Sequence, residues 1–402
     1  MTRISLQQAF SQGLRGILNV QSQLFKTQNQ ISTGKRVLTP ADDPVAAARI
    51  LQLDQATAET AQFQKNIKGA QTSLELEDTQ LDAVTNLLQR VRELTIQAGD
   101  GALSQSDRQG ISAELGARME ELVALANTRS ATGEYVFGGY KGEQTPFVGN
   151  GSGYFTYRGD DGQRLAQVSP TTMVATGDSG NDVFVAVRSP RLQNSAAATN
   201  TGTATISSGW VADQTTFNAS FNGDYTINFT SATTYDIVDS GGANVVTGAT
   251  YTSGDIIAFN GSEFRITGTP ATGDSFQLTP PSTQSILDTV ARVANTLSNY
   301  GDGTDDRLRL QDLIAETLDN LDSAETHIST KRGQIGARLN VLDSTVALHE
   351  GIDEVNQKVL SDVRDLDYAE AITRLTNEET VLQAAQQSFA RISNLSLFNF
   401  LR

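Results

Sequence analysis

Few side chains in this sequence could carry out chemistry, and they are scattered along it. The 402 residues include no Cys and only two His, His327 and His349. Without thiols, disulfides, thiolate nucleophiles and Cys/His metal sites are excluded. Neither His stands in a catalytic motif, and both fall within helical patterns. We therefore predict packing or surface roles for them rather than acid-base catalysis.

Adjacent aspartates are the other candidates, because paired carboxylates can bind Ca²⁺ or transfer protons. The pairs are Asp42-Asp43, Asp160-Asp161 and Asp305-Asp306. None has the spacing of an EF-hand loop, and aspartate oxygens commonly stabilise turns and helix N-termini. We interpret all three pairs as turn or cap residues. The sequence predicts a protein that is not an enzyme and uses no metal ion or cofactor.

Composition limits the partners as well. The formal net charge is −16, so nucleic acid or an anionic membrane would be repelled. No apolar run reaches the length of about eighteen residues that spans a bilayer. The N-terminal residues also lack the features of a secretory signal peptide, so export from the cell would need another route.

The elements that position these residues change along the chain. Only eight prolines occur, and no Lys lies between Lys141 and Lys331. This pattern predicts long helices in the outer parts and strands in the middle, that is, a mainly α fold with an inserted all-β domain. The predicted domains are residues 1–43 with 361–402 as a terminal coiled coil, residues 44–188 with 284–360 as a helical bundle with a β-hairpin, and residues 189–283 as an outer β insert.

Two heptad patterns predict a bundle of long antiparallel helices formed by the two halves of the chain. From Phe63 to Ala98 the three-and-four spacing is unbroken. From Ile314 to Leu342 an apolar residue recurs every seven positions, and the helical spacing continues through Ile352, Val355 and Val359. Because the two segments have similar lengths, we predict that they pack against each other.

Period-two patterns predict the strands. Short strands are expected at residues 135–137, 154–157, 165–168 and 182–187, with Gly159 to Gly162 as the turn of a hairpin. Within the insert, residues 225–229, 235–238 and 256–259 have the length and composition of sandwich strands.

Both ends of the chain carry apolar stripes that are diluted by polar residues. The N-terminal stripe follows alternating steps of four and three but includes Gln21 and Gln28, so one pair of such helices would associate weakly. The chain also finishes on an apolar cluster that a soluble monomer would bury. We predict that other subunits complete both ends. The residues of this predicted assembly interface are Phe10, Leu14, Ile17, Leu24, Ile31, Leu382, Phe389, Ile392, Leu395, Leu397 and Phe398.

Several segments resemble the flagellin superfamily, and together they are more similar to its flagellar hook-associated protein 3 family than to filament flagellin. The resemblance lies on both sides of the β insert and does not include it. The segments that carry it are Ile31 to Arg36, Pro40 to Ala47, Leu87 to Leu94, Tyr135 to Gly139, Gly336 to Asn340, Asp365 to Ala371 and Leu395 to Phe398.

The resemblance implies a structural protein at the hook-filament junction of the bacterial flagellum, between hook-associated protein 1 and flagellin. It implies secretion through the flagellar type III apparatus, an export chaperone on the C-terminal segment, and self-association into a ring or helical array. Filament flagellin is the alternative within the superfamily. The alternative of another class is a surface adhesin or glycan-binding protein that acts through residues 189–283.

Overall fold

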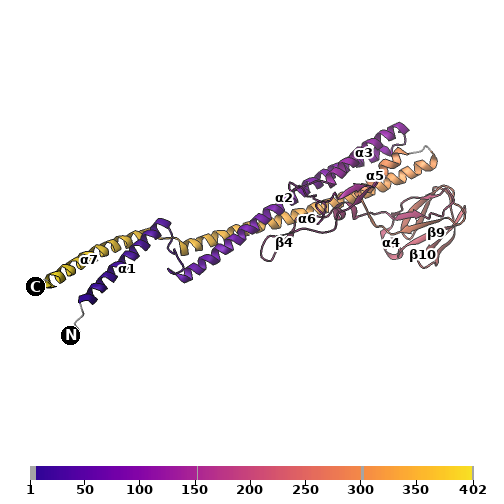
Figure 1. Cartoon of the computed structure of the whole chain (residues 1–402). Helices are drawn as coiled ribbons and strands as arrows, with labels where there is room; N and C mark the ends of the chain where they lie inside the picture. The colour runs from indigo at the N-terminus through magenta and orange to yellow at the C-terminus, as the bar shows by residue number, and fades with distance from the viewer. Residues whose placement is uncertain (1–5, 152, 300–302, 401–402) are drawn as a thin grey trace. The chain divides into compact units, whose positions relative to one another are not determined.

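The computed structural model describes residues 6–151, 153–299 and 303–400. It is mainly α, with a β-rich domain inserted between α3 and α5, as predicted. The chain divides into two compact units, residues 1–65 with 344–402 and residues 66–343, so that α2 and α6 each run through both. The predicted division into three domains stays a prediction. The longer helices are α1 (Leu6–Thr33), α2 (Pro44–Ala98), α3 (Gln105–Ala126), α5 (Ile286–Ser298), α6 (Thr304–Arg364) and α7 (Tyr368–Phe400) (Figure 1).

Heptads of α2 and α6 form the helical core of the second unit. Every heptad position of α2 from Ile67 to Ala98 is buried, as are those of α6 from Leu321 to Leu342. Full burial of a large aliphatic side chain contributes about 1.5–3 kcal/mol, so this contact stabilises the unit strongly. Arg332 of α6 pairs with Asp78 of α2 at 2.8 Å, and Gln71 donates to Asp343 at 2.8 Å. The predicted antiparallel packing is confirmed.

Two shorter helices pack together beside this pair. α3 begins at a capping box, in which Ser104 Oγ accepts from the backbone N–H of Asp107 and the Asp107 carboxylate accepts from the backbone N–H of Ser104. Ser112 Oγ of α3 donates to the carbonyl of Ala294 in α5 at 2.8 Å. Buried side chains line both helices, including Leu115 in α3.

Short strands beside the bundle pair differently from the prediction. The expected hairpin around Gly159 to Gly162 is wrong, because β2 (Phe155–Tyr157) pairs with β1 (Phe147–Gly149), and β3 (Leu165–Gln167) pairs with β4 (Met173–Ala175). The Asp160 carboxylate accepts from the backbone N–H groups of Tyr140 and Gly162 at 2.8 and 2.9 Å. These bonds tie the loop to a distant segment instead of closing a tight turn.

Two more predicted strands are absent from the described segments concerned. Residues 135–137 form a turn with one β-bridge at Tyr135. Residues 181–185 form a π-helix, η1 (Asn181–Val185), which precedes β5 (Val187–Arg188). Consecutive Val183 and Phe184 are both fully buried, which an alternating strand does not allow, and the Phe184 ring lies edge-on to Phe137 with 5.0 Å between centroids.

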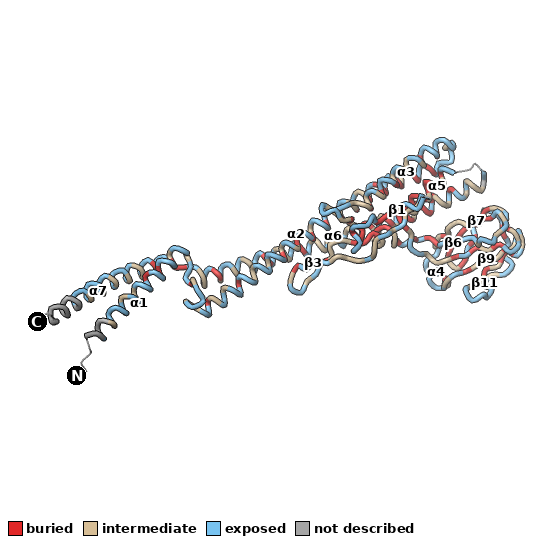
Figure 2. Tube along the Cα trace, in the orientation of Figure 1, coloured by how far each residue is buried: buried red, intermediate tan, exposed pale blue. Residues whose placement is uncertain are grey.

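The β insert is a two-sheet domain with its own aromatic core. One antiparallel sheet has the order β11-β10-β9-β14-β6, and the other has the order β12-β13-β7 with β8 also on β13. Phe229, Phe264 and Phe276 fill the core, which Figure 2 shows as buried tube segments in β9 and its neighbours. The three predicted sandwich strands lie in β9, β10 and β12. The bounds are β6 (Gln193–Ala196), β7 (Thr205–Ile206), β8 (Trp210–Val211), α4 (Gln214–Ser220), β9 (Tyr225–Ser231), β10 (Thr234–Asp239), β11 (Asn244–Thr250), β12 (Ile256–Phe259), β13 (Ser262–Thr267), β14 (Ser275–Thr279) and β15 (Thr283–Gln284).

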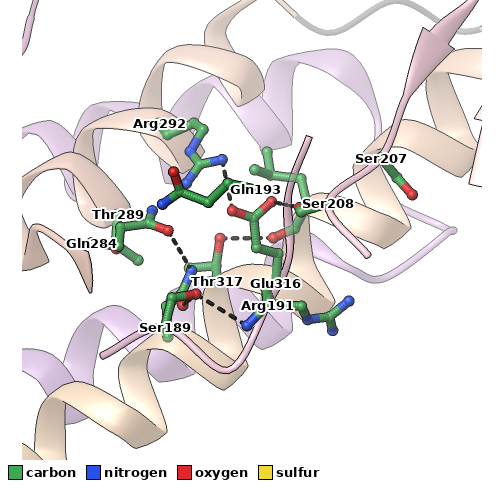
Figure 3. A network of polar contacts seen from close by, with 12 residues as sticks. Ser189, Arg191, Gln193, Ser207, Ser208, Gln284, Thr289, Arg292, Glu316 and Thr317 are labelled. Carbon is green, nitrogen blue, oxygen red and sulfur yellow. Dashed lines mark hydrogen bonds and ion pairs between the residues drawn. The ribbon is translucent and has the colours of Figure 1, made fainter. Parts of the chain in front are cut away.

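A polar network holds the base of the insert against α5 and α6 (Figure 3). Buried Glu316 of α6 pairs with Arg292 of α5 at 2.6 Å and accepts from the hydroxyl of Ser208 in the insert. Arg191 pairs with Asp319 at 2.6 Å. β15 also pairs with β5, so the segment that enters the insert is hydrogen-bonded to the segment that leaves it.

One carboxyl group interrupts the apolar heptad of α2. Glu77 is completely buried; its Oε1 accepts from the backbone N–H of Asp178 at 3.2 Å, while its Oε2 has no hydrogen-bond partner. Burial, followed by the negative charge of Asp178, raises the pKa of Glu77 to about 8. The side chain is therefore mainly protonated at neutral pH and loses that proton in mild alkali.

The raised pKa predicts that Glu77→Gln changes the pH dependence of stability. A carboxyl group whose pKa is higher in the folded state stabilises fully below its unfolded value of 4.5, and the contribution is lost as the pH rises through 8. Urea unfolding should give similar free energies for wild type and variant at pH 5. At pH 9 the variant should be more stable by about 2–4 kcal/mol.

Exposed Glu75 on the same helix supplies the control. The Glu75→Gln variant should follow the wild type at every pH. Parallel pH profiles for wild type and Glu77→Gln would show that Glu77 is already ionised in the folded protein.

Candidate assembly interface

Helices α1 and α7 of the first unit pair in antiparallel orientation. Gly13 of α1 lies against the Phe389 ring, where a Cβ atom would come within 3.1 Å of the ring carbon Cδ2. Towards the other end of the pair, Arg374 Nη2 donates to Gln30 Oε1 at 3.4 Å. The inner columns follow steps of four and three on both helices, namely Gly13, Ile17, Val20, Leu24, Thr27 and Ile31 on α1 and Ala371, Leu375, Glu378, Leu382, Ala385 and Phe389 on α7.

Two turns fasten this pair where α1 meets α2 and α6 meets α7. The Arg36 backbone N–H donates to the Arg364 carbonyl at 2.7 Å, and the Leu366 backbone N–H donates to the Gly34 carbonyl at 2.9 Å. These two bonds flank a β-bridge between Lys35 and Asp365. Gly34 has a φ of 69°, which L-residues with side chains adopt at a cost. The turns therefore hold α1 beside α7 by backbone geometry.

Asp42 and Asp43 serve the same region as turn and cap residues. Asp42 Oδ2 accepts from the backbone N–H groups of Leu38 and Thr39 at 3.1 and 2.9 Å. Its hydrogen bond with Lys26, and then its backbone bonds, lower the pKa of Asp42 to about 2. Asp43 Oδ1 accepts from the backbone N–H of Ala46 in the first turn of α2 at 2.9 Å. The sequence interpretation of this pair is confirmed.

The N-terminal stripe predicted from the sequence has the wrong register. Ile17, Leu24 and Ile31 face α7 as expected, but Leu14, Gln21 and Gln28 are exposed. Their places are taken by Gly13, Val20 and Thr27, each one residue earlier in the chain. Ile17, Leu24 and Ile31 fit two heptad patterns, one that adds residues 13, 20 and 27 and one that adds residues 14, 21 and 28. The first pattern has the smaller side chains, which allow α1 to approach α7 more closely.

The wrong register leaves a second apolar column on α1. Leu14, Leu18 and Phe25 keep 43%, 54% and 55% of their surface exposed. A comparable column lies on the C-terminal part of α6, where Leu348, Ile352 and Val355 are 60%, 42% and 61% exposed. The predicted helical spacing through Ile352, Val355 and Val359 is confirmed, since α6 continues to Arg364. These residues lie outward because buried His349 takes the inner position and packs on Phe63 with 5.8 Å between ring centroids. Sequence reasoning missed Leu18, Phe25 and Leu348 as surface residues, although a second three-and-four spacing was visible in each helix.

The other predicted interface residues are placed as follows. Leu24 is buried, and Ile17, Ile31, Leu382 and Phe389 are partly buried between α1 and α7. The side chains of the rest lie outside the described residues, namely Phe10, Ile392, Leu395, Leu397 and Phe398. Their part in an interface stays a prediction.

The remaining candidates for chemistry have structural contacts. Asp305 and Asp306 lie in the first turn of α6, and His327 Nε2 lies 2.7 Å from the Asp182 carbonyl. Within residues 6–151, 153–299 and 303–400, no three His, Asp or Glu side chains gather closely enough to hold a metal ion. Over the same residues, no helix is both long and apolar enough to cross a membrane.

The contact of Gly13 with Phe389 predicts different effects for two glycines of α1. Alanine favours helix over glycine by about 1 kcal/mol. At Gly16 nothing lies within 4 Å of the added Cβ, so Gly16→Ala should slow amide hydrogen exchange in α1. At Gly13 the methyl group meets Phe389, so Gly13→Ala should give less protection in α1 and speed exchange in α7. Equal protection by both substitutions would show that α1 does not pack on α7 at this point.

Comparison with known proteins agrees with the helical ends and the inserted domain. The family described as bacterial flagellin N-terminal helical region matches residues 4–142, and the one described as bacterial flagellin C-terminal helical region matches residues 318–401. Flagellar hook-associated protein 3 of Salmonella typhimurium is 35% identical over 187 residues, which are 46% of this chain and 58% of that protein. This chain thus spans little more than half the length of that relative. Flagellin A of Vibrio cholerae is 23% identical over 397 residues, covering 95% of this chain and 94% of its own length.

The solved structures include one from Legionella pneumophila, described as flagellar hook associated protein-3. It superposes with a TM-score of 0.66 and 31% identity, covering 78% of this chain and 98% of its own length. With both flagellin helical regions matched and this identity across nearly all of a solved hook-associated protein 3, the chain belongs to the flagellar hook-associated protein 3 family of the flagellin superfamily.

Proposed function

We propose that this protein is the structural adaptor of the bacterial flagellum at the junction between hook and filament. Family membership supports the proposal, but the observation that carries it is the leftover apolar column on α1. Leu18 and Phe25 expose more than half of their surface in the isolated chain. Exposed large side chains at coiled-coil spacing are typical of helices that other subunits cover.

The partners follow from this role. Copies of the chain associate with one another in a ring or helical array, hook-associated protein 1 lies on the hook side, and flagellin lies on the filament side. Contacts between unlike faces generate such arrays, and similar helical faces on neighbouring axial proteins can continue them. The protein acts outside the cell after export through the flagellar type III apparatus, with a chaperone on its C-terminal segment. A chain without Cys can be threaded unfolded, since no disulfide must be broken.

The distribution of buried and exposed apolar side chains supports a mechanical rather than a catalytic task. The buried heptads of α2 and α6 make a rigid pair of helices, while α1 and the C-terminal part of α6 each expose large apolar residues at coiled-coil spacing. The polar network of Glu316 and Arg191 fixes the insert to α5 and α6. The insert can therefore vary in sequence without disturbing the helices that would carry the assembly contacts.

Deleting the gene tests the function. We expect cells to keep complete hooks in electron micrographs, to lack filaments and to release flagellin into the medium. The wild-type gene should restore filaments. Leu18→Asp should not, because it places a charge in the exposed column without touching the core. Filaments on cells that lack the gene would contradict the proposal.

A second measurement separates an adaptor from filament flagellin. Purified protein added to filament seeds should bind without growing into long filaments, because an adaptor contacts two different partners. Continued elongation by this protein alone would identify it as a flagellin instead.

A further inference from the structure

The two exposed apolar columns of the first unit have the same geometry. On α1 the column runs through Leu14, Leu18, Gln21 and Phe25, with steps of four, three and four. On α6 it runs through Leu348, Ile352, Val355 and partly buried Val359, again with steps of four, three and four. This spacing keeps side chains facing one partner helix over two heptads. Each column is therefore shaped to receive a helix.

Other exposed large apolar residues of this unit do not form such a column among the residues whose side chains are described. Val45 and Leu51 of α2 are six residues apart and point to different sides of the helix. Tyr368 and Ile372 of α7 make a single step of four, and Val381 does not continue it. By spacing, the columns on α1 and α6 are each other's best match.

Charge favours the same match. Helix α1 contains Arg15 and Lys26 and no acidic residue, which gives it a charge of +2; Lys26 pairs with Asp42 of the same chain at 2.8 Å, so Arg15 is the cation beside the column. The whole chain has a net charge of −16, so the rest of the chain carries −18 (−16 minus +2). The stretch of α6 that bears the column carries exposed Glu350 and Glu354 and partly buried Asp353 against one cation, exposed Lys358, so its net charge is −2 (−3 plus +1). A basic helix is attracted to the acidic surface of another copy, and an acidic helix would be repelled.

Both columns are exposed in the same folded chain, so neither covers the other within one molecule. We propose that the α6 column of one copy, centred on Ile352, seats the α1 column of a second copy, centred on Leu18. The contact is between unlike surfaces, so each copy offers one column and receives another, and the association continues from copy to copy. This inference rests on the proposed function and adds the pair of surfaces by which copies join.

Cysteine cross-linking on the full-length chain tests the pairing, since the natural sequence has no Cys that could interfere. Leu18→Cys protein is mixed with Ile352→Cys protein at concentrations where wild type sediments as oligomers, and a short bismaleimide is added. The matched control replaces Ile352→Cys with Val45→Cys, an exposed apolar position outside both columns. Circular dichroism checks that each variant keeps the helical content of wild type.

We expect several-fold more cross-linked dimer from Leu18→Cys with Ile352→Cys than from the Val45→Cys mixture or from either variant alone. Equal yields in all mixtures, or dimers of Leu18→Cys with itself in excess, would overturn the pairing. If wild type forms oligomers but Leu18→Cys links elsewhere, the pairing is wrong and the adaptor function stands. If wild type stays monomeric at every concentration and also fails to bind isolated hooks, both are wrong.

Discussion

Helix α1 can bury only one of its two apolar columns against its own chain. The column Ile17, Leu24 and Ile31 is common to two heptads, one completed by Gly13, Val20 and Thr27 and the other by Leu14, Gln21 and Gln28. The first faces α7 because small residues let the helices approach, with Phe389 filling the space above Gly13. Leu14, Gln21 and Gln28 stay exposed, together with Leu18 and Phe25. A helix with apolar residues on two sides is complete only when it has two partners.

Other contacts within the first unit keep the outer apolar column of α1 exposed. The backbone bonds of Arg36 and Leu366 fix α1 beside α7 at one end, so the pair cannot rotate to bury the outer column. The neighbouring stretch of α6 behaves similarly, since His349 occupies the inner position and leaves Leu348, Ile352 and Val355 outside. In both helices polar or small residues take some of the inner positions, while large apolar residues such as Leu18 and Ile352 face outward. The exposed apolar columns of this unit thus follow from the register of its helices.

The second unit supplies rigidity instead. Its α2 and α6 heptads are buried over many turns, and the pair is crossed by ion pairs such as Arg332 with Asp78. Glu77 is the exception within the apolar heptad, and its protonated side chain is compatible with that environment because its pKa is raised to about 8. The insert adds a separate aromatic core, attached through Glu316 and Arg191. These buried contacts make the second unit rigid.

Sequence patterns predicted most of the fold but only part of the interface. The heptads from Phe63 to Ala98 and from Ile314 to Leu342 had one consistent reading, because large apolar residues recur at the same heptad positions along most of each segment. On α1 two registers shared three residues, and the choice depended on how closely Phe389 approaches Gly13, which no local pattern reveals. The strand pairing around Asp160 was missed for a similar reason, since its carboxylate binds the backbone of Tyr140 twenty residues away.

Maleimide labelling of single cysteines before and after assembly tests the two-sided character of α1 most directly. A cysteine at Leu18 should react quickly in dilute protein and become protected in the assembled state. A cysteine at Val20, on the side that faces α7, should react slowly in both. Equal reactivity of the Leu18 position in dilute and assembled protein would contradict the account, since the outer column would then have no partner in the assembly.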